Sequence, residues 1–115
     1  MRSDVSCTVF ISEPTSYEGG ELVIHLGDRA LPMKGAPGAA IVYPSTTLHE
    51  VAPVRRGERL VSITFIESLV VNEQDRWILF ELGDISSLEG DNMDPANRMR
   101  LEVIRNNLTR RWSAI

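Results

Sequence analysis

The hydrophobic pattern of the first half of the chain predicts short β-strands joined by turns. Strands are expected at 5–11, 21–26, 29–33 and 39–43, and the segments between them are rich in glycine, proline, serine and aspartate. Closely spaced short strands of this kind predict a sandwich or barrel built mainly from antiparallel strands.

The first of these strands carries the single cysteine of the chain, Cys7. Cys7 alternates with Val5, Val9 and Ile11, which predicts that these four side chains share one face. We therefore expect Cys7 to be a small buried apolar residue and not a nucleophile. A single cysteine forms no internal disulfide, which fits a reducing compartment.

A β-hairpin is predicted near the middle of the chain. Its strands are expected at 51–54 and 60–66, with a turn at 55–58. On the second strand Arg59 shares its face with three apolar residues, namely Val61, Ile63 and Phe65. Arg59 is thus expected to point inward, where an unpaired cation is costly.

His49 and Arg59 are the candidate functional residues of this hairpin. With an odd number of residues in the loop, His49 projects onto the same face as Arg59. Histidine binds divalent metals through neutral imidazole, and arginine binds a carboxylate in bidentate fashion. The pair suggests a site for a metal and a carboxylate. The alternative is a surface hairpin in which both groups are solvated or paired with Glu50 and Glu58.

The pattern changes to helical after Ser68. Asn72 is a suitable N-cap for a helix that we expect to end at Leu82, with Gly83 as its stop signal. Residues 83–93 then read as a polar linker.

A second helix is predicted to begin where Asp94 provides a cap and Pro95 occupies the first helical position. Four apolar residues fall at helical spacing along it, namely Leu101, Ile104, Leu108 and Trp112. We expect a β core at 1–68 and a helical extension at 69–115 packed on the same domain.

Composition narrows the class of protein. A length of 115 residues suits one domain with one core. The net charge of −4 argues against a nucleic-acid-binding surface, and the arginines at 105, 110 and 111 fit a solvated helix end. We find no apolar run of transmembrane length and no signal peptide, so we expect a soluble cytoplasmic protein without a membrane partner.

Several motifs occur in a characteristic order. They are Arg2-Ser3-Asp4-Val5-Ser6, Tyr17-Glu18-Gly19-Gly20-Glu21-Leu22, Tyr43-Pro44-Ser45, Leu48-His49-Glu50-Val51, Arg56-Gly57-Glu58-Arg59 and Leu108-Thr109-Arg110-Arg111-Trp112. Together they resemble the PKHD-type hydroxylases, bacterial iron(II)/2-oxoglutarate dioxygenases related to prolyl and lysyl hydroxylases. The resemblance extends over nearly the whole chain.

This resemblance implies a partial double-stranded β-helix, or jelly roll, with two α-helices. It implies that His49 is an iron ligand, that Arg59 binds the far carboxylate of 2-oxoglutarate, and that Tyr43 is a candidate pocket residue, with core packing as its alternative role. The implied cofactors are Fe(II) and L-ascorbate, and the cosubstrates are 2-oxoglutarate and O2. The reaction would couple oxidative decarboxylation to hydroxylation of a substrate that the sequence does not identify.

The sequence departs from the family at the metal site. The family holds iron with two histidines and one aspartate, but this chain has no His-x-Asp motif, and its second histidine, His25, does not match a ligand position. We therefore expect the C-terminal portion of such an enzyme, from a truncated or misannotated reading frame, that is inactive alone. Loss of early strands would expose a sheet edge and permit homo-oligomers. The alternative is a non-catalytic cupin-like module for organic-acid binding or oligomerisation.

Overall fold

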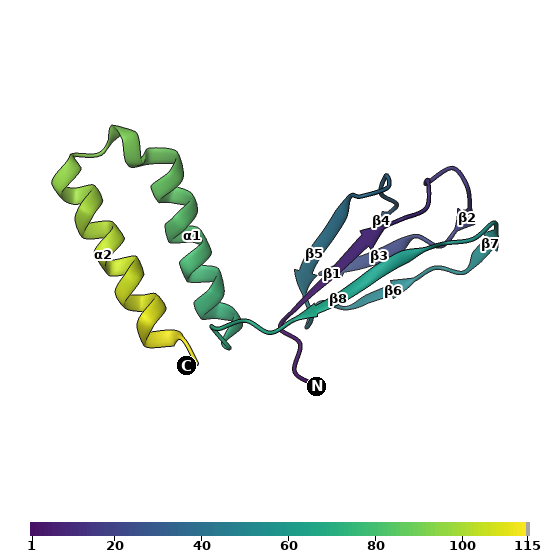
Figure 1. Ribbon diagram of the computed structural model, residues 1–115, viewed down its shortest axis with the longest axis horizontal. Helices are drawn as coiled ribbons and strands as arrows, with labels where there is room; N and C mark the ends of the chain where they lie inside the picture. Colours follow the sequence, from purple (N-terminus) through teal and green to yellow (C-terminus); the bar gives the residue numbers. More distant parts are fainter. Residues whose placement is uncertain (115) are drawn as a thin grey trace. The chain divides into compact units, whose positions relative to one another are not determined.

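The computed structural model describes residues 1–114, which fall into two compact units, Met1–Glu67 and the segment from Ser68 onward. Within these residues there are eight β-strands, one short 3-10 helix and two α-helices (Figure 1). The predicted class, mainly β with two C-terminal helices, is confirmed. Among residues 1–114, no helix is long and apolar enough to cross a membrane. The docking of the helices on the β unit stays a prediction.

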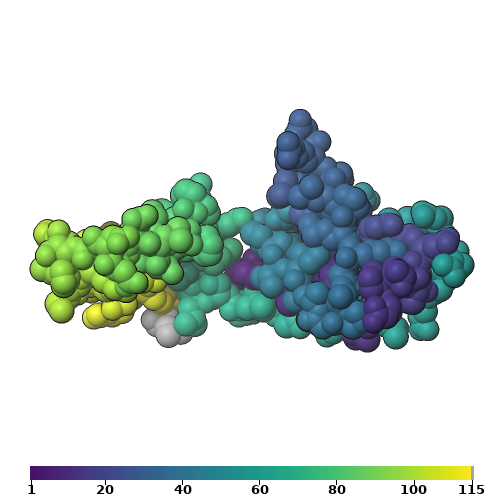
Figure 2. All heavy atoms as spheres, turned by 90° about the horizontal axis from the view of Figure 1, so that it is seen from above, coloured from purple at the N-terminus to yellow at the C-terminus, as the bar shows by residue number. Residues whose placement is uncertain are grey.

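The β unit contains two three-stranded antiparallel sheets and one two-stranded pair. The strands are β1 Val5–Phe10, β2 Glu18–Gly19, β3 Leu22–Leu26, β4 Arg29–Met33, β5 Ala40–Pro44, β6 His49–Val51, β7 Val54–Arg56 and β8 Val61–Ile66. The strand orders are β5-β1-β8 and β4-β3-β6, and β2 pairs with β7. The β3–β4 hairpin (blue) projects from the rest of this unit (Figure 2).

The core lies between the two three-stranded sheets. Leu22 and Ile24 of β3 and Tyr43 of β5 form one buried cluster, and Met33 and Ile41 pack against it. Each sheet therefore buries one face against the other, as in a β-sandwich. This arrangement confirms a partial jelly roll.

The inward face of β1 is the opposite of the one that the sequence predicts. Ser6, Thr8 and Phe10 are buried, whereas Cys7 is only half-buried, so the prediction of a buried Cys7 face is wrong. The cross-strand register explains the difference, because it pairs Ser6 with Tyr43 of the core. The side chains of such a pair lie on the same face of a sheet.

The predicted hairpin is also wrong. Its strands separate, because β6 pairs with β3, β7 with β2, and β8 with β1. Pro53 lacks the N–H needed to continue a ladder, and its carbonyl instead accepts from the Gly20 amide at 3.1 Å. Gly57 then turns the chain with a φ of 77°. The next strand, β8, joins the β5-β1-β8 sheet, whereas β6 belongs to the β4-β3-β6 sheet.

The helical unit begins as the sequence predicts. Helix α1 spans Glu73–Glu89, and Asn72 caps it by accepting from the Asp75 amide. After the 3-10 helix η1 (Gly90–Asn92), α2 spans Pro95–Trp112 with Asp94 as its cap. Both N-cap predictions are confirmed.

Helix α1 does not stop at Gly83, so the predicted linker from residue 83 is wrong over its first part. A Cβ at Gly83 would lie 2.9 Å from Nη2 of Arg105. The glycine therefore makes room for a guanidinium of α2. Next to it, Ser86 is buried and donates to Oε1 of Glu102 at 2.7 Å, while Arg105 donates to both Glu102 oxygens. The two contacts between helices, Gly83 with Arg105 and Ser86 with Glu102, favour continuation of α1 through the glycine over its local preference.

The Glu102 contacts predict a pH-dependent stability of the helical unit. The hydrogen bond from Ser86, and then the one from Arg105, hold the pKa of Glu102 below its usual value of 4.5. A lowered folded-state pKa adds stability above the unfolded pKa, and this stability is lost as the pH falls through the folded value. Urea unfolding followed by tryptophan fluorescence checks this, because both tryptophans, Trp77 and Trp112, lie in this unit. Glu102→Gln should reduce the loss of stability at low pH. If this variant and the native chain lose stability equally at low pH, the role of Glu102 is contradicted.

Candidate functional site

His49 lies on the inward face of the β4-β3-β6 sheet. Its cross-strand partner is Ile24, which is buried in the core, so both side chains point towards the other sheet. The imidazole contacts the ring of Tyr43 from that other sheet, with ring centroids 4.9 Å apart and planes tilted by 60°. Tyr43 is thus both a core residue and the neighbour of His49.

A hydrogen bond sets the orientation of the His49 ring. Its Nδ1 lies 2.8 Å from the backbone carbonyl of Thr47, a distance at which Nδ1–H donates to the oxygen. In this tautomer the lone pair is on Nε2. Metal-binding histidines commonly donate their other ring nitrogen to a backbone carbonyl in this way. His49 therefore has the form of a histidine ready to bind a metal through Nε2.

Arg59 carries a buried hydrogen-bond donor that no group among the described residues satisfies. Its Nε is buried, and within residues 1–114 it has no hydrogen-bond partner. Val61, two residues after Arg59, pairs with the buried residue Phe10 and so faces inward. The strand pairing extends back to Leu60, whose carbonyl accepts a hydrogen bond from the Ile11 amide. Strand alternation therefore places Arg59 on the inward side, as the sequence predicts.

The absence of a side chain at Gly20 makes room for the Arg59 side chain. A Cβ at Gly20 would lie 3.1 Å from Cδ of Arg59, 3.0 Å from a methyl group of Val54 and 3.2 Å from the ring of Tyr17. Tyr17 is almost fully buried, and Lys34 lies over its ring at 4.1 Å. Gly20 thus lets an aromatic ring, an aliphatic side chain and the arginine stem pack close together.

The sandwich is open on the side where His49 lies. Four inward residues of the edge strands β6 and β8 are exposed, and we call this set the open side: His49, Val51, Ile63 and Phe65. Ile63 and Phe65 are 58% and 53% exposed, whereas Tyr43 at the other edge of the same sheet is 9% exposed. A small molecule can therefore reach the inward face from this side.

Sequence reasoning missed two polar residues of this inward face. Ser6 and Thr8 are each 3% exposed, and the Ser6 hydroxyl bonds to that of Ser45 at 2.8 Å, which bonds in turn to that of Ser3 at 2.7 Å. Polar residues at inward positions of a strand are unexpected from hydrophobic alternation. Serine and threonine at every second position of a strand were the signal that could have found them, because exceptions to the hydrophobic pattern concentrate at functional sites.

The described residues do not form a complete metal site. Among residues 1–114, no group of three or more histidine, cysteine, aspartate or glutamate side chains is placed to hold a metal ion. His25 is paired with Glu50 at 3.2 Å, and cross-strand pairing places both on the face of the sheet opposite to His49. His25 is therefore not a second ligand beside His49.

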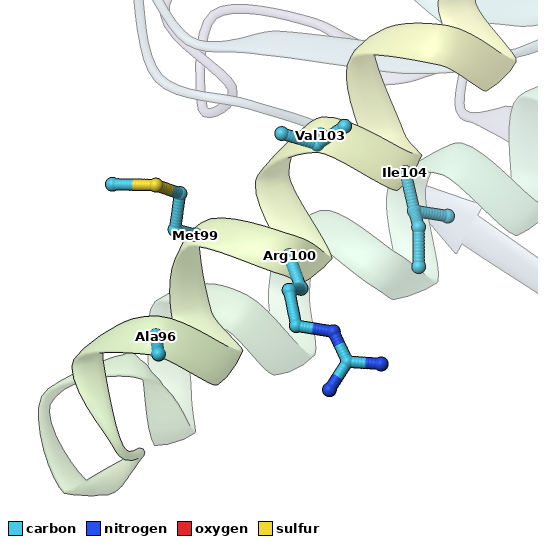
Figure 3. Close-up of a pocket in the computed structure, with 5 residues that line it drawn as sticks. All are labelled: Ala96, Met99, Arg100, Val103 and Ile104. Carbon is cyan, nitrogen blue, oxygen red and sulfur yellow. The ribbon is translucent and has the colours of Figure 1, made fainter.

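An apolar surface hollow lies elsewhere, on α2. It has a volume of about 480 Å³ and is lined by Ala96, Met99, Arg100, Val103 and Ile104 (Figure 3). Its lining is almost entirely apolar, and none of these residues is a metal ligand or a nucleophile. We therefore assign the candidate site to the β unit and not to this hollow.

Comparison with known proteins gives the family. Residues 1–67 match the model of the 2OG-Fe(II) oxygenase superfamily. A PKHD-type hydroxylase of Sphingopyxis alaskensis is 55% identical over 112 residues, which cover 97% of this chain and 51% of that protein. PKHD-type hydroxylases of Xylella fastidiosa (strain M12) and Paraburkholderia xenovorans are 46% and 45% identical over 114 residues, covering 98% of this chain and 50% of each relative. This chain thus spans about half the length of these relatives, and it belongs to the 2OG-Fe(II) oxygenase superfamily.

Proposed function

We propose that the β unit is the 2-oxoglutarate-binding part of an iron(II)-dependent hydroxylase, with Arg59 as the carboxylate-binding residue and His49 as one iron ligand. The observation that carries this proposal is the buried Nε of Arg59, which lacks an acceptor among the described residues. The family, to which the chain belongs, supports 2-oxoglutarate as the carboxylate.

The energetics of Arg59 favour a bound anion. A buried N–H without a partner costs about 1–3 kcal/mol, more if the group is charged. A carboxylate would satisfy this donor and could accept two parallel hydrogen bonds from the planar guanidinium. Lysine offers no such fork, which makes arginine the better residue for this task. The arginine stem lies beside Gly20, which the buried ring of Tyr17 also approaches, and partial exclusion of water there would strengthen the attraction.

The neighbours of His49 would orient its ring so that Nε2 can bind iron. The Thr47 carbonyl holds the ring in the tautomer that leaves Nε2 free, and the ring of Tyr43 contacts the imidazole. Iron in this family supplies the oxygen chemistry, whereas the protein positions the reactants. One histidine does not make a complete iron site, so His49 needs further ligands that the described residues do not provide. The L-ascorbate requirement stays a prediction.

A second candidate function is a non-catalytic organic-acid-binding module. The incomplete ligand set favours it, because Arg59 can bind a carboxylate without any metal. The two functions share the carboxylate site and differ only in the metal.

Anaerobic calorimetry tests both parts of the proposal on the 115-residue chain. We expect one molecule of 2-oxoglutarate to bind per chain, and we expect Fe(II) to bind more weakly than the micromolar range, because a single imidazole is a poor site for this ion. Absence of 2-oxoglutarate binding would remove the proposed role of Arg59. A one-to-one iron site of micromolar affinity or better would contradict the single-ligand interpretation.

A further inference from the structure

The chain crosses from one three-stranded sheet to the other in the short segment just before His49. Strand β5 ends at Pro44 and β6 begins at His49, and the two strands belong to different sheets. The amide of Thr47 donates to the carbonyl of Pro44 at 2.9 Å, which closes a turn over residues 44–47. The carbonyl of Thr47 in turn accepts from Nδ1 of His49. The position of this turn therefore sets the orientation of the imidazole.

Ser45 connects this turn to the start of β1. Its hydroxyl lies 2.8 Å from the hydroxyl of the buried Ser6 and 2.7 Å from that of Ser3. One hydroxyl can make both hydrogen bonds, because it donates once and accepts through two lone pairs. The amide of Ser45 also donates to the carbonyl of Asp4 at 3.0 Å. Ser45 is therefore bonded through both its side chain and its backbone to the segment that begins β1.

The buried end of this hydroxyl chain makes the position of the turn sensitive to Ser45. Buried polar groups are nearly always hydrogen-bonded, and a buried hydroxyl that loses its partner is costly. Without the Ser45 hydroxyl, Ser6 loses the partner that it has in the structure, so the turn must move or admit water. Either change alters the contact between the Thr47 carbonyl and Nδ1 of His49, which a distance of 2.8 Å makes a short hydrogen bond.

We propose that Ser45 is a positioning residue for His49. By bonding the 44–47 turn to Ser6, it holds the Thr47 carbonyl where that group selects the Nδ1–H tautomer and leaves Nε2 available to a metal. Partners that orient a metal-binding histidine in this way commonly determine how well it binds. The inference rests on the proposed function only in taking His49 as the iron ligand. Its test needs neither iron nor 2-oxoglutarate, so calorimetry can overturn the proposed function independently.

The tautomers of the two histidines can be read from long-range 1H–15N NMR spectra at about pH 8.5, where histidine is neutral. Nε2 of His25 lies 3.2 Å from Oε1 of Glu50, so His25 should carry its proton on Nε2, whereas His49 should carry it on Nδ1. In Ser45→Ala, the ratio of Nδ1–H to Nε2–H at His49 should fall by about threefold or more, as expected when one hydrogen bond is weakened. His25 should keep its native signals and so report that the β unit is folded.

Three further variants separate positioning from a general effect on stability. Ser45→Thr keeps the hydroxyl and should keep the native tautomer of His49. Ser12→Ala removes another hydroxyl with two partners, the Leu60 amide and the Glu58 carbonyl, and should leave both histidines unchanged. Ser6→Ala removes the buried partner of Ser45 and should shift His49 in the same direction as Ser45→Ala, which keeps the test decisive if Ser45→Ala does not fold.

A purely structural role of Ser45 has a different signature. Ser45→Ala would then lower the free energy of unfolding, but His49 in the folded chain would keep its proton on Nδ1. That result would overturn the proposal. A shift of His49 in Ser12→Ala as large as the one in Ser45→Ala would overturn it as well.

Discussion

Replacement of Arg59 by alanine should strongly weaken 2-oxoglutarate binding, while the β unit stays folded. Truncation of one partner of a buried, hydrogen-bonded charge pair costs about 2–5 kcal/mol. Since 1.4 kcal/mol corresponds to a factor of ten, Kd should rise by about thirtyfold or more. Calorimetric titration of the purified variant with 2-oxoglutarate measures this change directly.

Two control variants separate the role of Arg59 from a general charge effect. Arg55→Ala on β7 removes an exposed arginine of the same unit and should leave Kd within about twofold, because exposed charges contribute little. Arg59→Lys keeps the charge but loses the planar fork, so it should recover only part of the affinity. Equal 2-oxoglutarate binding by the native chain and Arg59→Ala would remove Arg59 from the site.

Replacement of Gly19 by alanine should cause the largest loss of stability of any single change considered for the β unit. Gly19 has a φ of 73°, and a Cβ at this position would overlap the carbonyl oxygen of Pro53. The left-handed conformation alone costs a non-glycine residue about 1–2 kcal/mol. The overlap with backbone adds to this cost, so we expect a total of about 3 kcal/mol or more. Near-UV circular dichroism of the tyrosines, both of which lie in this unit, reports the unfolding.

Gly27→Ala is the matched control for this change. Gly27 also has a positive φ, 63°, but a Cβ there meets nothing within 4 Å. Its alanine variant should therefore lose only about 1 kcal/mol, the cost of the backbone conformation. Similar losses in the two variants would show that the close approach between Gly19 and Pro53 does not contribute.

Local sequence patterns identified many of the elements, because their signals depend on near neighbours. Strand β4 was predicted with its observed bounds, and β1, β3 and β5 within one residue at each end. Asn72 and Asp94 are recognisable as helix caps because a capping side chain bonds to a backbone amide three residues away. His49 and Arg59 were selected from their residue chemistry and from the resemblance to a family, and the superfamily was confirmed. Their individual roles stay proposals.

The sequence by itself therefore determined the positions of β1, β3, β4 and β5, the helix starts and the family of this protein. Only the tertiary structure decided which face of β1 is buried, which partners β6, β7 and β8 take, and that α1 continues through Gly83. The physical reason is the range of the interactions. Turns and caps depend on residues a few positions apart, whereas burial of Ser6, exposure of β8 and the contact of Gly83 with Arg105 depend on segments that meet only in the folded chain.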